Sequence, residues 1–527
     1  MRYATRMTRM LLCASALICM ANAPAFAGPE VSVAQGKLEG KQDGLVQAFL
    51  GIPFAAPPVG ELRWRAPQPA ATWTGTRDAT DFGASCMQTL LPEGRAPWTP
   101  EYVVQNKISE DCLSLNVWTP AKADARKPVL VWIHGGGFNE GSGSVPIYNG
   151  SQLAGRDIVV VNVNYRLGAL GFMGHPEITK ENKAKGEPAA NFGLQDQIAA
   201  LKWVQQNIAA FGGDPANVTI AGQSAGSMAV HSLVSSPLAK GLFARAIAQS
   251  GLPTIIPMPE LAESEKKGAD FAAEKGVSTL AQLRALPAEA FIITANTTGG
   301  LRFGASVDGM LLPASPAEIL AKGTFNDVPM IVGQTADEGS AFPGYGSGDA
   351  AAYKAFMTRS FGKKVESFQK LYPSDTEAAR SQSMKDVARD RGLAMIDNWA
   401  RLRASKGKSP VYTYYYTHAE PGEGSDKFGA FHSSEIPYAL STLDASPERN
   451  FTLADRQLSL AMSSFWVNFV RNGNPNGEGL PNLSPVTAVS VPTMVFGSTV
   501  APRELMDAEK LAAYRAFVAQ GGTLSMF

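Results

Sequence analysis

Short apolar runs alternate along the chain with longer segments of helical periodicity, and this alternation restricts the fold more than any other feature. The apolar residues of 193–208, 453–470 and 508–518 recur on one face of a helix. Six runs of four to eight residues fit strands that are buried on both faces: 128–133, 158–165, 218–221, 246–249, 328–332 and 411–416. Strands that alternate with helices predict an α/β fold, in which a mostly parallel sheet with right-handed connections carries helices on both faces.

The composition favours one large folded body over other classes of chain. Of the 527 residues, 45 % are hydrophobic and 18 % are charged, whereas about 25 % are charged in typical soluble domains. The 47 basic and 47 acidic side chains balance without a basic block, which excludes binding to nucleic acid through bulk charge. No linker-like stretch interrupts the chain, so we expect a single domain over 28–527, with a largely helical insertion at about 260–407 that caps the sheet.

The first 27 residues have the pattern of an export signal. Three arginines flank the start of an apolar run at 10–20, which is too short to span a bilayer, and an A-x-A cleavage motif ends at Ala27. We therefore predict a signal peptide at 1–27, whose removal leaves an exported protein, periplasmic or secreted; an N-terminal anchor helix is the alternative. No later run approaches membrane-spanning length, so we expect no stable membrane insertion.

Two cysteines, Cys86 and Cys112, remain after Cys13 and Cys19 leave with the signal. An even pair in an exported chain favours a disulfide, and closing a loop of this size stabilises a fold by about 3 to 4 kcal/mol on the chain-entropy model. Two free buried thiols are the alternative.

A G-x-S-x-G motif at 222–226 directly follows the run 218–221, and residues 227–233 can continue as a helix. A serine at a sharp strand-to-helix turn projects its hydroxyl above the end of the sheet, and flanking glycines relieve the clash that larger residues would cause. The motif predicts Ser224 as a nucleophile and directs the next amide, that of Ala225, toward a developing oxyanion.

Three consecutive glycines follow the run 128–133, within the sequence HGGGF at 134–138. Such a run is costly in backbone entropy, and backbone amides that must approach a ligand without a side chain in the way would explain it. Amides there, together with Ala225, would stabilise a tetrahedral intermediate. The alternatives are a flexible turn and a phosphate-binding loop, although neither GK[ST] nor G-x-G-x-x-G follows.

Two of the five histidines are candidates for a general base. In a fold with this nucleophile turn the partners follow in the order serine, acid, histidine, which excludes the histidines before Ser224. His231 lies two helical turns beyond Ser224 and points away from it. His418 ends a predicted strand, whereas His432 lies in a loop of small residues that can reach back over the sheet, so we favour His432.

The acid should lie between the nucleophile and this histidine. Asp337 and Glu338 follow the run 328–332 by a few residues, at the expected edge of the sheet, and Asp308 is a rival that could equally be a turn residue. Spacing does not separate Asp337 from Glu338, because either carboxylate could hold the imidazole tautomer and stabilise the imidazolium.

With these motifs in view, the chain resembles the type-B carboxylesterase family, the cholinesterase-like branch of the α/β-hydrolases. The resemblance covers nearly the whole mature chain. It rests on FLGIP at 49–53, PPVGELR at 57–63, SEDCL at 109–113, HGGGF at 134–138, NYRLG at 164–168, GLQDQ at 193–197, GQSAGS at 222–227, DEG at 337–339, FH at 431–432 and WVNF at 466–469. The resemblance implies the α/β-hydrolase fold and a secreted, bacterial-type serine carboxylesterase.

The family pattern also assigns roles that the residues alone left open. It implies Glu338, rather than Asp337, as the acid that joins Ser224 and His432 in a catalytic triad. It implies that the oxyanion amides come from Gly136, Gly137 and Ala225.

Two structural pairs follow from the resemblance as well: a disulfide between Cys86 and Cys112, and a buried ion pair between Arg63 and Glu110. The segment 480–485 departs from the family pattern, which often has an aromatic residue there. The choline-binding tryptophan of the cholinesterases is not matched at its usual spacing, so choline selectivity is unsupported.

We expect two-step hydrolysis of uncharged, bulky or apolar carboxylic esters through an acyl-enzyme. No metal and no organic cofactor is expected, since the sequence has neither HExxH nor a clustered Cys/His ligand set. The expected partner is a small-molecule ester, with no nucleic acid, and the sequence sets no oligomeric state. A peptidase or amidase with the same triad, and a non-catalytic binding protein on the same scaffold, are the alternatives. Four aromatic residues are candidates for an apolar entrance, or for ordinary surface or core packing: Trp98, Tyr102, Phe342 and Tyr345.

Overall fold

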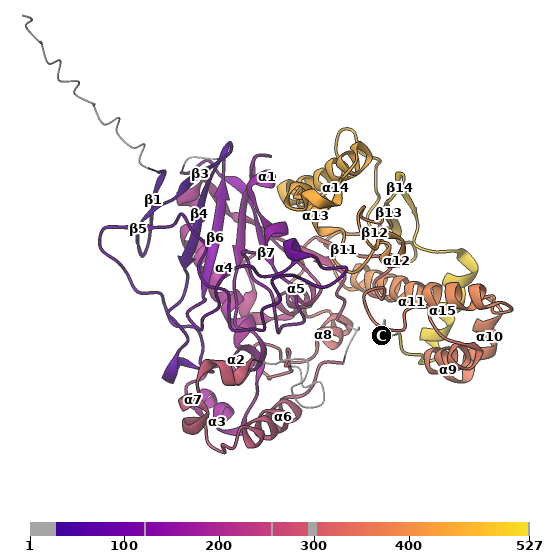
Figure 1. Cartoon of the computed structure of the whole chain (residues 1–527), viewed down its shortest axis with the longest axis horizontal. Helices are drawn as coiled ribbons and strands as arrows, with labels where there is room; N and C mark the ends of the chain where they lie inside the picture. The colour runs from indigo at the N-terminus through magenta and orange to yellow at the C-terminus, as the bar shows by residue number, and fades with distance from the viewer. Residues whose placement is uncertain (1–27, 121–122, 254–256, 293–302, 525–527) are drawn as a thin grey trace, which may run out of the picture.

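A computed structural model describes residues 28–120, 123–253, 257–292 and 303–524, and it is built around one large twisted sheet (Figure 1). In these residues eleven strands pair in the order β14-β13-β12-β11-β10-β9-β7-β8-β6-β4-β3. From β13 through to β8 every neighbouring pair is parallel, and the strands at both edges are antiparallel. The predicted α/β class with a mostly parallel sheet is confirmed. The predicted signal peptide at 1–27 lies outside the described residues.

The six predicted strands all occur, with ends that differ by a few residues. They are β7 (Lys127–Ile133), β8 (Val159–Val163), β9 (Gly213–Gln223), β10 (Arg245–Gln249), β11 (Met330–Thr335) and β12 (Val411–Tyr416). The remaining strands of this sheet were not predicted, because they are short or carry polar residues: β3 (Lys41–Asp43), β4 (Val46–Pro53), β6 (Ser114–Thr119), β13 (Pro492–Phe496) and β14 (Val500–Glu504). A separate small sheet joins β1 (Glu30–Val33), β2 (Gly36–Glu39) and β5 (Thr76–Asp78).

Alternate side chains of the central strands enter two different hydrophobic clusters. In β7, Val129, Val131 and Ile133 belong to one cluster and Leu130 and Trp132 to the other. Successive residues of a strand point to opposite faces, so a continuous apolar run is required when both faces are covered.

Helices cover both faces of this sheet, as the alternation predicted. The first cluster contains apolar residues of α4 (Phe192–Asn207), α5 (Ala225–Ser235) and α11 (Glu377–Lys406). The second contains those of α14 (Leu453–Asn472). The sheet is therefore a rigid, doubly covered platform for the loops at the ends of its parallel strands.

The range 260–407 is largely helical, and it holds six α-helices in the described residues. They are α6 (Leu261–Glu274), α7 (Leu280–Ala285), α8 (Pro316–Lys322), α9 (Ala350–Phe361) and α10 (Val365–Gln369), followed by α11. Strand β11 lies inside the same range, so this helical segment passes through the central sheet.

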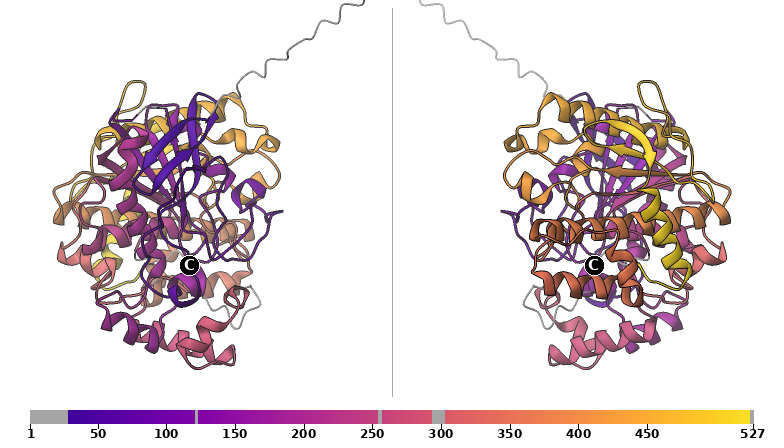
Figure 2. Two further views of the ribbon diagram at one scale, coloured as in Figure 1. Left: turned by 90° about the vertical axis from the view of Figure 1, so that its left-hand side faces the viewer. Right: turned by 90° about the vertical axis from the view of Figure 1, so that its right-hand side faces the viewer.

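Four of these helices lie in two groups. Helices α6 and α7 lie with α3 (Pro176–Ala184) at the bottom of the molecule in every view (Figures 1 and 2). Helices α9 and α10 lie with α15 (Ala508–Ala519) on the right of Figure 1. None of the helices in the described ranges has both the length and the apolarity that crossing a bilayer requires.

Candidate active site

Ser224 occupies a sharp turn between β9 and α5. Its backbone has φ +59° and ψ −123°, a conformation that costs a non-glycine residue energy and persists only where the surroundings impose it. A Cβ on Gly226 would lie 2.1 Å from the carbonyl oxygen of Ile133, and one on Gly222 would lie 2.6 Å from the backbone of Gly226. The two glycines of the motif are therefore needed for β9, α5 and β7 to approach one another, and Ser224 is left partly exposed.

Glu338 and His432 are in direct contact. Glu338 lies in the loop after β11, where its Oε1 accepts a hydrogen bond of 2.8 Å from the amide of Thr335. Its other oxygen, Oε2, is paired with Nδ1 of His432. His432 lies in the loop between α12 (Ser425–Phe428) and α13 (Ile436–Ala439).

The other candidates for the acid and the base make different contacts. Asp337 accepts hydrogen bonds from the hydroxyl of Tyr345 and from the amide of Ala430, and so ties its loop to the one that carries His432. Asp308 accepts from the amides of its own turn, and His418 is paired with Asp455 at 2.7 Å.

The Glu338–His432 pair shifts the pKa of both groups. Burial alone would raise the pKa of Glu338, but the His432 charge and hydrogen bonds from His432, Ser250 and Thr335 outweigh it, so this pKa lies below its ordinary value. Burial alone would lower the pKa of His432, but Glu338 and, to a smaller extent, Glu435 raise it above its ordinary value. Glu338 therefore stays ionised, and His432 accepts a proton more readily than free imidazole.

Three backbone amides near Ser224 are available to a ligand. In the described part of the chain, the N–H groups of Gly136, Gly137 and Ala225 donate to no backbone or side-chain acceptor. Gly136 has φ +99° and Gly137 has φ +61°, which are backbone conformations that favour glycine. A Cβ on Gly136 would lie 2.1 Å from the carbonyl oxygen of Glu140, so a side chain cannot replace the hydrogen there.

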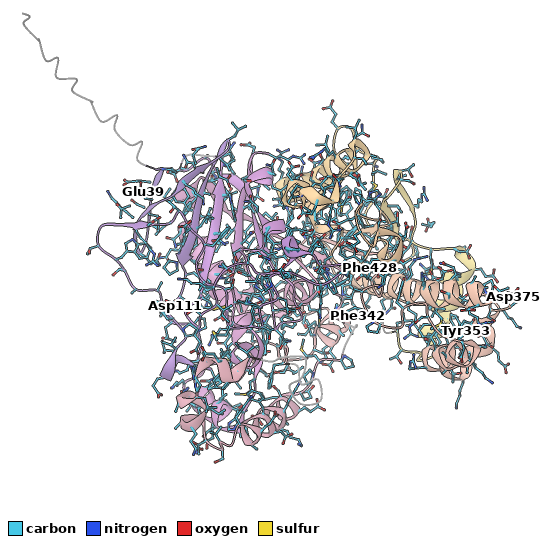
Figure 3. The ribbon with its side chains drawn as sticks, viewed as in Figure 1. Glu39, Asp111, Phe342, Tyr353, Asp375 and Phe428 are labelled. Atoms are coloured by element: carbon cyan, nitrogen blue, oxygen red, sulfur yellow. A yellow bond between two sulfur atoms is a disulfide. The ribbon has the colours of Figure 1, made fainter. Side chains whose placement is uncertain are left out.

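Ser224, His432 and the three glycines after β7 line one cavity of about 200 Å³. Nine of its twenty lining residues lie between Cys86 and Cys112, so this loop builds nearly half of the wall. Three of the four aromatic candidates are among the lining residues: Trp98, Tyr102 and Phe342. Phe342 lies near the middle of the molecule (Figure 3). The fourth candidate, Tyr345, instead donates to Asp337.

The disulfide and the ion pair that the resemblance implied are both present. Cys86 and Cys112 are joined. Arg63 donates from Nε and Nη2 to the two oxygens of Glu110, and both side chains are largely buried. In the segment that departs from the family pattern, Leu483 is fully buried and hydrogen-bonded through its backbone to Asn476.

Removing the disulfide should affect both stability and substrate binding. The bridge spans 26 residues, and a double Cys86→Ala, Cys112→Ala variant is expected to lose about 3 to 4 kcal/mol of unfolding free energy. Because the loop walls the cavity, KM is expected to rise by more than kcat falls. Chemical denaturation and steady-state kinetics test this prediction, with reduced and reoxidised wild-type protein as the matched comparison. Equal unfolding midpoints for the two forms would show that the bridge stabilises nothing.

A second buried carboxyl group near Glu338 and His432 was not anticipated. Glu435 is fully buried, and its Oε1 accepts hydrogen bonds from Gln249, Ser250 and Tyr414. Burial, followed by the nearby charge of Glu338, raises its pKa to about 7. The sequence indicates only that Glu435 lies three residues after His432. This spacing does not distinguish a buried glutamate from an exposed one in a loop.

Known proteins are similar to this chain over most of their length. Residues 27–513 match the carboxylesterase family. The chain is 38 % identical to fumonisin B1 esterase of Sphingopyxis macrogoltabida over 487 residues, which cover 89 % of this chain and 86 % of that protein. It is 34 % identical to para-nitrobenzyl esterase of Bacillus subtilis over 467 residues, which cover 85 % of this chain and 91 % of that protein.

Solved structures agree with the sequence matches. A structure of PNB esterase superposes with a TM-score of 0.76 at 33 % identity, and the match covers 91 % of this chain and 98 % of that one. The carboxylesterase Est55 of Geobacillus stearothermophilus superposes with a TM-score of 0.79 at 32 % identity, over 93 % of this chain and 99 % of that one. Together these matches show that the chain belongs to the carboxylesterase family of enzymes and has the α/β-hydrolase fold.

Proposed function

We propose that this protein is a serine esterase that hydrolyses carboxylic esters through an acyl-enzyme on Ser224. The observation that carries the proposal is a convergence in one cavity. It brings together a strained, partly exposed serine, an imidazole paired with an ionised carboxylate, and the amides of Gly136 and Gly137, which, like that of Ala225 next to the serine, have no acceptor in the described residues.

In the first half of the reaction His432 takes the proton of the Ser224 hydroxyl, and the oxygen attacks the ester carbonyl. The amides of Gly136, Gly137 and Ala225 hold the oxyanion, and Glu338 stabilises the imidazolium. The carbon–oxygen bond to the alcohol then breaks, and His432 gives its proton to the leaving alcohol. In the second half, water attacks the acyl-enzyme with His432 again as the base, and the acid is released.

The cavity wall supports esters with an uncharged, apolar group of some bulk as substrates. Leu91, Trp98, Val103 and Phe342 contribute apolar surface to it. Para-nitrobenzyl esterase of Bacillus subtilis is named for an uncharged aromatic ester group. Cocaine esterase of Homo sapiens, which is 36 % identical over 477 residues, is named for a bulky ester. Export is proposed with the function, since a disulfide is compatible with an oxidising compartment.

A panel of p-nitrophenyl esters, with matched p-nitroanilides, tests the proposed activity. We expect turnover of the esters, an initial burst of p-nitrophenol when deacylation is slow, and at least a hundredfold weaker turnover of the anilides. Comparable rates for esters and anilides would favour an amidase. Binding of the esters without turnover would favour a non-catalytic binding protein.

The pH profile tests the role of His432 separately. The base must be neutral to act, and the pKa of His432 is raised. The acidic limb of kcat/KM is therefore expected to have its midpoint above about 6.5, the ordinary value for histidine. Activity is retained above that midpoint and lost below it. Glu435→Gln is expected to move the midpoint downward, because it removes a charge that raises the pKa. A profile that stays flat down to about pH 4 contradicts this assignment.

A further inference from the structure

The residue that directly precedes Ser224 is in contact with the triad imidazole. Gln223 ends β9, and its side chain is buried. Its Nε2 lies 3.3 Å from Nε2 of His432. Its Oε1 accepts a hydrogen bond of 3.2 Å from the hydroxyl of Ser433, the residue after His432. The amide thus connects the nucleophile turn with the loop that carries the base.

The chemistry of the two groups fixes the direction of the contact with His432. The ionised Glu338 carboxylate can only accept, so Nδ1 of the neutral ring carries the proton and Nε2 presents a lone pair. The carbonyl oxygen of the Gln223 amide already accepts from Ser433, so its nitrogen faces the ring and can only donate. The Gln223 N–H therefore donates to the same lone pair that must receive the Ser224 proton.

We propose, resting on the function proposed above, that Gln223 is a positioning residue which holds His432 in its neutral, resting orientation. The contact suits only the neutral ring. Once Nε2 of His432 is protonated, its N–H group faces the N–H group of the Gln223 amide. The two donors repel each other, so the imidazolium moves away from Gln223. The ring then directs its proton toward the leaving alcohol in the cavity instead of remaining bound to the protein. A carboxylate in the place of the amide would do the opposite, because it would accept from Nε2–H and hold the imidazolium.

Few other charged groups face the ring. Glu338, from the loop after β11, and Glu435, from the loop of His432 itself, are the carboxylates that act on it. Glu140, from the loop after β7, lines the same cavity, as does Arg95 from the disulfide loop. Tyr414 of β12 hydrogen-bonds to Glu435. Replacing Gln223 removes none of these groups, so we assign a shift in the titration of His432 to residue 223.

Two substitutions separate the proposal from a merely structural role. Gln223→Glu should stabilise the imidazolium and move the acidic midpoint of kcat/KM upward by about one pH unit or more. This shift corresponds to about tenfold less activity at pH values a unit or more below the wild-type midpoint. Gln223→Met removes the donor at similar volume and should give a smaller upward shift. Gln334→Met is the matched control, since Gln334 is a buried glutamine at the end of β11 that donates to the carbonyl of Arg389.

The titration of His432 is also measured by NMR in a Ser224→Ala background, which does not require activity. The protein has five histidines, and a His432→Gln spectrum assigns the resonance. We expect the pKa of His432 to be lowest with the wild-type Gln223, higher in Gln223→Met and highest in Gln223→Glu. In the control Gln334→Met it should equal the wild-type value. If wild type turns over esters and all four titrations coincide, the positioning role is overturned. If the titrations shift in the expected order but no ester is turned over, the contact with Gln223 is supported and the proposed esterase function is overturned.

Discussion

Ser224→Ala is expected to lower kcat for p-nitrophenyl ester hydrolysis by about a millionfold, the size of effect seen when the nucleophile of a serine hydrolase is removed. The oxyanion amides and the cavity remain, so KM should change little and a small residual rate should persist. The methyl group of alanine takes the place of the serine Cβ, so the strained turn is retained. Steady-state kinetics measure the loss.

The same variant should lose covalent labelling by a fluorophosphonate. Ser232→Ala is the matched control: it removes a hydroxyl from the same helix α5, where Ser232 donates only to the carbonyl of Met228, one turn earlier. That control should keep wild-type labelling and activity. Persistent labelling of Ser224→Ala would show that another residue is the nucleophile.

Glu338→Gln is expected to lower kcat by about ten-thousandfold. An amide cannot stabilise the imidazolium as a carboxylate does. Its NH2 group, facing Nδ1 of His432, also favours the tautomer that carries its proton on Nε2 and cannot act as a base. KM should stay within a few-fold of wild type, because Glu338 does not line the cavity described here. Pre-steady-state measurement of acylation isolates the affected step.

Asp337→Asn is the matched control for this substitution, since it neutralises the neighbouring acid. Asp337 accepts hydrogen bonds from the amide of Ala430 and the hydroxyl of Tyr345, and the side-chain oxygen of asparagine can still accept one of them. A loss of less than tenfold is expected. If Asp337→Asn lowers activity as much as Glu338→Gln, the loss reflects disturbance of the loop that carries both residues, and the specific role of the Glu338 carboxylate is contradicted.

The central fold could be predicted because its signals are local. The run 128–133 is apolar at every position, and a strand covered on both faces needs such a run. The motif at 222–226 fixes a sharp turn, because there is no space for a Cβ atom at either of its glycines. The strands near the two edges lack such a signal: β4 contains Gly51 and Pro53, and β14 is partly exposed, so only pairing with their neighbours makes them strands.

A residue of the candidate site could be predicted from the sequence when few residues of its type are present. With five histidines in the chain and a required order of partners, His432 could be favoured from the residues alone. The acid could not, because Asp337 and Glu338 are adjacent and only the direction of the loop backbone decides which one faces the ring. Gln223 and Glu435 were missed because their importance depends on contacts between β9, β10 and the His432 loop, which no spacing reveals.

The most direct test of the account is a crystal structure after reaction with a slow organophosphate ester. The phosphorus is expected to be bonded to Ser224 Oγ, with a phosphoryl oxygen within hydrogen-bond distance of the amides of Gly136, Gly137 and Ala225 and with His432 Nε2 directed at the leaving-group side. A phosphorus bonded to another residue, or a phosphoryl oxygen that turns away from these three amides, contradicts the account.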